Sequence, residues 1–163
     1  MARSVFYSFH YDRDVHRVQL VRNINALEGQ PVLNAQKWEE VRYQGDKAIK
    51  NWIDEQMKYK KAVIVLIGAE TVNRPWVQYE IEHAWKIKKP LLGIRIHGLA
   101  SLREGADEEG PRTLFTDDGF SIPVFDPTSY GIFDSGIGID TKATYNNLVD
   151  NIEQWSREGV TRW

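Results

Sequence analysis

The most constraining feature of the sequence is an unbroken apolar run, Ala62–Ile67, which Gly68 closes. A run of this kind, bounded by a turn residue, is typical of a strand that is buried on both faces. Such strands occur almost only in parallel sheets that helices cover on each side. The run therefore predicts the central strand of an α/β fold.

The residues after this run predict a loop that opens a helix. The segment 73–81 includes Pro75, which suits the first turn of a helix because the N–H that it lacks has no helical partner there. Trp76 and Glu80 are four residues apart, so they share one face of that helix. An aromatic ring and a carboxylate would then stand together at the carboxyl end of a central strand, where open α/β sheets bind ligands.

Strand and helix patterns alternate along the rest of the chain. Strands are predicted over residues 4–9, 31–34, 62–67, 91–96 and 122–125. The first predicted helix follows a cap at Asp12 or Asp14 and ends at Gly29, and the second follows a cap at Asp46. The third covers residues 75–88, and the last runs from a cap at Thr141 to about residue 157. This alternation predicts an α/β, flavodoxin-like open sheet of five mostly parallel strands in the order 2-1-3-4-5, with helices on both faces. The loops after the first and third strands would flank one crevice.

A length of 163 residues predicts one domain over residues 1–163. Residues from about 97 to 121 are rich in Gly, Asp and Glu and lack periodicity, so we expect a surface insertion there. Residues 134–138 are expected to form another loop, and the last helix closes the domain.

Composition excludes several classes of function. The net charge of −2, without a basic block, argues against a nucleic-acid partner. The absence of cysteine excludes disulfides, zinc–thiolate sites and thiol nucleophiles, and we expect neither a metal site nor a bound cofactor. No signal-peptide pattern opens the chain, and no apolar run approaches the roughly 20 residues that cross a bilayer. We therefore expect a cytoplasmic protein without a membrane partner.

Glu80 is the strongest candidate for chemistry, although an exposed helical glutamate is the plainer alternative. One carboxylate is too few for the paired-acid cleavage of sugars. It could suffice for a glycosidic bond whose leaving group needs no proton, such as the nicotinamide of NAD, which leaves as a neutral pyridine. A carboxylate could stabilise the positive charge of that transition state. The residues by themselves do not single out NAD.

Other candidates lie on the loops beside this position. Residues 8–12 either line a substrate site, through Ser8, Phe9, His10 and Tyr11, or cap the following helix. Trp76 either stacks on a ligand or packs in the core. Trp38 either lines the same crevice or packs against it. The dinucleotide fingerprint, the Walker signature and the serine nucleophile elbow are absent.

Several segments resemble, in order and spacing, the bacterial TIR-like proteins of the Thoeris antiphage system, a subgroup of the Toll/interleukin-1 receptor superfamily. The resembling segments are residues 4–11, 21–23, 38–40, 65–68, 74–81 and 93–94. The resemblance covers about the first 96 residues, and the C-terminal third carries no motif that matches.

This resemblance implies a flavodoxin-like fold and a specific activity. Enzymatic members cleave the nicotinamide–ribose bond of NAD through a glutamate at the position of Glu80, with a tryptophan at the position of Trp76. Thoeris members release a cyclic ADP-ribose isomer, or a related ADP-ribose conjugate, that activates a separate effector. The resemblance places Phe9, His10 and Tyr11 beside the substrate, and Asn34 on a loop that covers the site. It also implies self-association through TIR–TIR contacts and a phage-derived trigger.

Two other functions remain open from the sequence. A TIR domain can act without catalysis, as a protein-interaction module, although the presence of both Trp76 and Glu80 favours an enzyme. A nucleoside deoxyribosyltransferase shares the open α/β sheet and uses a nucleophilic glutamate, which would form a covalent ribosyl-enzyme.

Overall fold

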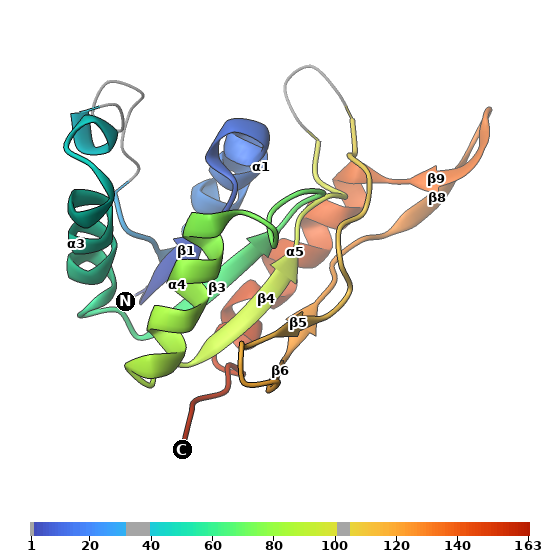
Figure 1. Cartoon of the computed structure of the whole chain (residues 1–163). Coiled ribbons are helices and arrows are strands. Elements are labelled where there is room, and N and C mark those ends of the chain that lie inside the picture. The colour runs from blue at the N-terminus through green and yellow to red at the C-terminus, as the bar shows by residue number, and fades with distance from the viewer. Residues whose placement is uncertain (1, 32–39, 101–104) are drawn as a thin grey trace.

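The computed structural model describes residues 2–31, 40–100 and 105–163 (Figure 1). Its helices are α1 (Tyr11–Asn23), α3 (Asp46–Met57), α4 (Pro75–Lys86) and α5 (Thr141–Trp155). Its strands are β1 (Arg3–Ser8), β2 (Leu27–Glu28), β3 (Ala62–Ile67), β4 (Leu91–Arg95), β5 (Leu114–Phe115), β6 (Ser121–Ile122), β7 (Val124–Phe125), β8 (Tyr130–Phe133) and β9 (Gly136–Ile139). No helix in these ranges is long and apolar enough to span a membrane.

Five strands form one sheet in the order β2-β1-β3-β4-β7, and every pairing in it is parallel. This confirms the predicted flavodoxin-like α/β sheet with strand order 2-1-3-4-5. The apolar run of β3 lies at the centre, and all six of its residues are buried. The sheet therefore has the topology in which the carboxyl ends of β1 and β3 flank a crevice.

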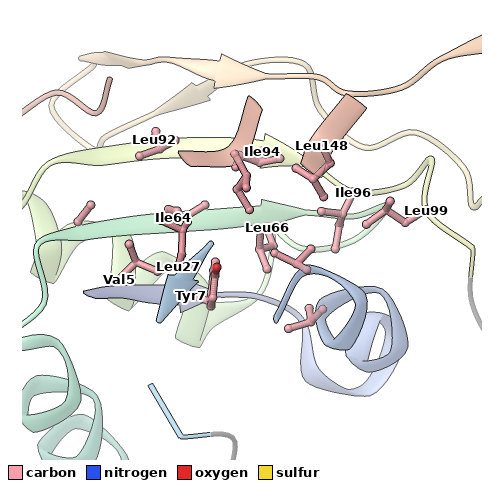
Figure 2. Close-up of a cluster of buried hydrophobic side chains, with 14 residues drawn as sticks. Val5, Tyr7, Leu27, Ile64, Leu66, Leu92, Ile94, Ile96, Leu99 and Leu148 are labelled. Atoms are coloured by element: carbon pink, nitrogen blue, oxygen red, sulfur yellow. The ribbon is translucent and has the colours of Figure 1, made fainter. Parts of the chain in front are cut away.

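Two hydrophobic clusters cover the two faces of the sheet. Ile64 and Leu66 of β3 pack in one cluster with residues of α1 and α5, such as Val18 and Leu148 (Figure 2). The alternate residues of β3 pack on the other face with α3 and α4. Because successive side chains of a strand point to opposite faces, a strand between two helical layers must be apolar throughout.

The first crossover differs from the predicted one. The second strand is β2, over Leu27–Glu28, and not residues 31–34; Pro31 is outside any strand, and residues 32–34 lie outside the described part. Helix α1 ends at Asn23 and not at Gly29. Gly29 instead allows a close approach, because a Cβ there would lie 2.7 Å from the ring of Tyr7.

Three predicted helix caps are also wrong. His10 caps α1 in place of Asp12 or Asp14, with its Nδ1 accepting a hydrogen bond from the backbone N–H of Arg13. Gly45 precedes α3, so Asp46 is its first residue and not its cap. Asp140, and not Thr141, caps α5: its side chain accepts from the N–H of Ala143.

The segment from residue 97 to 121 contains more structure than a surface loop. Its strand β5 pairs with β6 in an antiparallel ribbon, and His97, Leu99 and Leu114 are buried. Its backbone also approaches the end of β3 closely: a Cβ on Gly110 would overlap the carbonyl oxygen of Gly68. This part of the chain therefore packs against the same edge of the sheet that carries the candidate site.

The predicted last strand and the loop at 134–138 take different forms. Residues 122–125 divide between β6, in the small ribbon, and β7, at the edge of the main sheet. Residues 130–139 form a β8–β9 hairpin that projects from the body of the molecule (Figure 1). The opposed side chains of Ile132 and Ile137 are exposed on it, at 88% and 80%. Such a hairpin is hard to recognise in sequence because it buries no alternating apolar face.

Candidate active site

A cavity of about 390 Å³ opens at the carboxyl ends of β1 and β3, at the predicted crevice. Its walls come from the end of β1, the start of α1, the segment after β2, α3 and the first turns of α4. The residues that line it are Tyr7, Phe9, His10, Tyr11, Asp12, Gln30, Pro31, Arg42, Trp52, Ile53, Arg74, Pro75, Trp76, Val77 and Glu80. Five of the residues predicted from the sequence are therefore brought to one cavity.

Glu80 lies in this cavity and is only 8% exposed. Pro75 is the first residue of α4, so the helix carries Glu80 one and a half turns in from its start. The Oε1 atom of Glu80 accepts a hydrogen bond from the hydroxyl of Ser8 at 2.8 Å. Burial raises the pKa of the Glu80 carboxyl to about 8, against the opposing effect of the Ser8 hydrogen bond. A buried carboxyl in a cavity, with a pKa near neutrality, is a candidate functional group.

Ser8 reaches the site differently from the prediction. It is fully buried and is not among the residues that line the cavity. Its hydroxyl contacts Glu80 and is not part of the cavity wall.

His10 combines a capping role with a place in the cavity wall. It is 8% exposed, and its Nδ1 accepts the hydrogen bond that caps α1. Its Nε2 atom is buried and has no hydrogen-bond partner among the described residues. When Nδ1 accepts, Nε2 of a neutral imidazole carries the proton, so the ring has a buried donor to which no described residue is an acceptor.

Aromatic rings make up much of the wall. Trp76 is half-buried and packs edge-to-face on Tyr79, with ring centroids 5.9 Å apart. Phe9 and Tyr11 also line the cavity, with ring centroids 6.3 Å apart. Trp52 of α3 was not predicted. Aromatic faces of this kind suit a ligand that contains flat rings.

Sequence reasoning also missed polar residues of the cavity. Gln30 is buried, and its side chain accepts from the backbone N–H of Tyr7 at 2.8 Å and donates to its carbonyl at 2.7 Å. The side chain of Gln30 thus takes the place of a neighbouring strand beside Tyr7, because β2 pairs only with Arg3 and Ser4 of β1. No local pattern marks Gln30.

Arg42 and Arg74 place two guanidinium groups at the cavity. Both residues are exposed, and Arg74 also forms an ion pair with Glu70 at 3.3 Å. Guanidinium groups are suited to binding phosphate oxygens. The sequence could have indicated Arg74, because it directly precedes Pro75 at the start of the helix that carries Glu80. No feature of the sequence indicated Arg42.

Two predicted site residues, Asn34 and Trp38, lie outside the described residues. Their roles therefore stay predictions that derive from the resemblance and from loop position.

A buried ionic network lies beside the cavity. Asp14 and Arg17 of α1 are almost fully buried and form an ion pair at 3.5 Å. Burial raises the pKa of the Asp14 carboxyl, although the charges of Arg17 and His10 act in the opposite direction. Arg13 binds Asp107 through two hydrogen bonds, at 2.8 and 2.9 Å. The network ties the start of α1 to residues 97–121.

Comparisons with known proteins agree with this fold. The profile of a family described as "Thoeris protein ThsB, TIR-like domain" matches residues 6–101, which contain every residue that lines the cavity. A protein of Bacillus cereus (strain MSX-D12), named "Putative cyclic ADP-D-ribose synthase ThsB1", is 30% identical over 139 residues, which cover 78% of this chain and 72% of that protein. Since the profile spans more than half of the chain and the relative is similar over most of both chains, this protein belongs to the ThsB family of TIR-like Thoeris proteins.

Proposed function

We propose that this protein cleaves the nicotinamide–ribose bond of NAD and converts the remainder into a cyclic ADP-ribose isomer or a related ADP-ribose conjugate. The observation that carries the proposal is a single buried carboxyl, Glu80, in a cavity lined by aromatic rings. The name of the Bacillus cereus relative, "Putative cyclic ADP-D-ribose synthase ThsB1", supports the same reaction. As the resemblance implies, the product would activate a separate effector in the cytoplasm.

The chemistry needs little from the protein beyond placement and charge. The bond between the ribose carbon and the nicotinamide nitrogen breaks, and its electron pair goes to the ring, which leaves as a neutral pyridine. The ribosyl group then carries a positive charge, which the carboxylate of Glu80 stabilises. Attack by a nitrogen or hydroxyl of the same ADP-ribose gives a cyclic product with loss of a proton.

The lining residues have distinct roles in this proposal. Phe9, Tyr11 and Trp76 pack on the flat rings of NAD, and His10 donates a hydrogen bond to it through Nε2. Arg42 and Arg74 face the diphosphate, whose negative charges match two guanidinium groups. Ser8 acts through Glu80.

The direct test is an assay of NAD consumption with mass spectrometry of the products, in lysates of infected and uninfected cells that express the protein. Infected cells are included because a phage-derived trigger or self-association would be needed for full activity. A product at the mass of cyclic ADP-ribose supports the cyclase, and one heavier by a water indicates simple hydrolysis. A still heavier adduct indicates a conjugating enzyme.

Other outcomes of this assay support other functions. Intact NAD in infected cells would favour a TIR domain that acts only through protein contacts. A covalent ribosyl group on Glu80, detected in the intact protein, would favour the deoxyribosyltransferase chemistry.

The pH dependence of the reaction follows from Glu80. Only its ionised form can stabilise positive charge, and its pKa is raised to about 8. We therefore expect kcat/KM for NAD to rise about tenfold per pH unit from about pH 6 and to level off above pH 8, since this ratio reports ionisation of the free enzyme. A profile that is flat over this range would contradict a carboxylate mechanism.

Trp76→Ala should weaken the enzyme through lost stacking. We expect KM to rise and kcat to fall, with kcat/KM lower by roughly ten- to a hundredfold, because ring stacking is worth about 1–3 kcal/mol. Trp76→Phe, which keeps an aromatic face, should retain most of the activity. An unchanged KM in the alanine variant would argue against stacking on the substrate.

A further inference from the structure

The hydrogen bond between Ser8 and Glu80 joins β1 to α4 on the inner side of the cavity. The hydroxyl of Ser8 donates to Oε1 of Glu80 at 2.8 Å, and the serine is fully buried. Glu80 lines the cavity whereas Ser8 does not. The serine therefore contacts the carboxyl group from outside the cavity lining.

The backbone holds Ser8 in place from two sides. Ser8 lies opposite Val65 in the parallel ladder between β1 and β3. On the other edge, the side chain of Gln30 binds both the N–H and the carbonyl of the preceding residue, Tyr7. Because the serine side chain is short and its backbone is fixed on both edges, the position of its hydroxyl is set by the sheet.

We propose that Ser8 is a positioning residue: its hydroxyl holds Oε1 of Glu80 on the inner side and so presents Oε2 to the substrate. The role of the substrate in this inference rests on the proposed function. Among the described residues, the hydrogen bond that the Glu80 side chain accepts is the one from Ser8 to Oε1. A carboxylate fixed by one oxygen loses less freedom when it meets a developing positive charge, which is how preorganised groups stabilise transition states.

Other charged groups near Glu80 stay in place when the hydroxyl of Ser8 is removed, so the effect of the hydroxyl on Glu80 can be measured alone. The charged and titratable groups that share the cavity are His10 and Asp12 at the start of α1, Arg42, Arg74, and the phenols of Tyr7 and Tyr11. Burial raises the pKa of Glu80, and the hydrogen bond from Ser8 opposes that rise. Removal of the hydroxyl should therefore raise the pKa of Glu80 further, because a donor to a carboxylate favours its ionised form.

The test measures the titration of Glu80 directly, by NMR of the full chain with carbon-13 in the glutamate carboxyl groups. The signal that Glu80→Gln lacks identifies the residue. We expect Ser8→Ala to raise the midpoint of the Glu80 titration by about one pH unit. A hydrogen bond to a charged group is strong enough to shift a pKa by about that amount or more. Ser8→Thr, which keeps the hydroxyl, and Ser4→Ala, in the same strand away from the site, should leave the midpoint in place.

Ser8→Cys provides a second decisive variant, because it fills the same space with a weaker donor. It should shift the midpoint upward by less than alanine does. Unchanged midpoints in folded Ser8→Ala and Ser8→Cys would overturn the inference. The pH at which kcat/KM levels off should rise in parallel with the NMR midpoint.

The NMR measurement separates this inference from the proposed function because it needs no turnover. A shifted midpoint in a protein that leaves NAD intact would support the positioning contact and contradict the enzyme. NAD cleavage with an unshifted midpoint would contradict the role of Ser8 alone.

Discussion

Glu80→Gln should abolish NAD cleavage and leave the fold intact. Glutamine has the same shape, and its carbonyl can still accept the hydrogen bond from Ser8, but it cannot carry the negative charge. We expect kcat to fall by at least about 10²–10³-fold, the loss seen when one preorganised stabilising group is removed. Nicotinamide release by the purified variant measures the effect, and thermal unfolding reports on the fold.

Glu82→Gln is the matched control for this variant. Glu82 lies two residues further along α4, and its Oε1 accepts a hydrogen bond from the backbone N–H of Asp117 at 2.8 Å, away from the cavity lining. Glutamine can accept the same bond, so turnover should be normal. Normal turnover by Glu80→Gln as well would show that the carboxylate is not the catalytic group.

Glu80→Gln should also change how the stability of the protein depends on pH. The pKa of Glu80 is raised from 4.5 to about 8 in the folded protein, so the folded state binds a proton that the unfolded state has released between these values. The stability that the neutral carboxyl contributes is therefore fully present below about pH 4.5 and is lost as the pH rises to about 8. Glu80→Gln should gain stability relative to the wild type across this range.

Arg17→Met should lower the free energy of unfolding more than any other substitution proposed for this protein. Arg17 is 2% exposed, pairs with Asp14, and donates hydrogen bonds to the carbonyls of Leu99 at 2.9 Å and Gly105 at 3.1 Å. Its removal leaves a buried carboxyl and two carbonyls without their partner. We expect the free energy of unfolding in urea to fall by about 3–5 kcal/mol, as for other broken buried pairs.

Two variants test the cause of that loss. Arg112→Met removes an exposed arginine, 72% accessible, that pairs with Glu109, and it should change stability by less than about 1 kcal/mol. Asp14→Leu together with Arg17→Met removes both members of the buried pair and should be more stable than Arg17→Met alone. A double variant no more stable than the single one would show that the lost carbonyl contacts, and not the unpaired carboxyl, dominate.

The part of the candidate site that follows directly from a strand could be predicted. Phe9, His10 and Tyr11 come at the end of β1, and Trp76 and Glu80 open the helix after β3. Parallel strands end at one edge of the sheet, so an assignment of strands is enough to bring these residues together. Gln30, Arg42 and Trp52 reach the cavity through packing of the second crossover, for which no local pattern exists.

Charge in the sequence was a poor guide to burial. Asp14 and Arg17 have the spacing of ordinary surface residues on a helix, yet both are buried, and Arg17 contacts Asp107 and the carbonyls of Leu99 and Gly105. The carbonyl partners of Arg17 are 82 and 88 residues away along the chain. A contact of such sequence separation appears only when the fold has formed.

The sequence by itself determined the fold class, the strand order and the family, because a fully apolar central strand between helical patterns allows few arrangements and the motifs of the first 96 residues are specific. Tertiary structure decided the rest. The burial that raises the pKa of Glu80, and the hydrogen bond from Ser8 that opposes the rise, exist only where β1, β3 and α4 meet. Hydrophobic periodicity is a property of neighbouring residues, whereas desolvation of a charge depends on everything that packs around it.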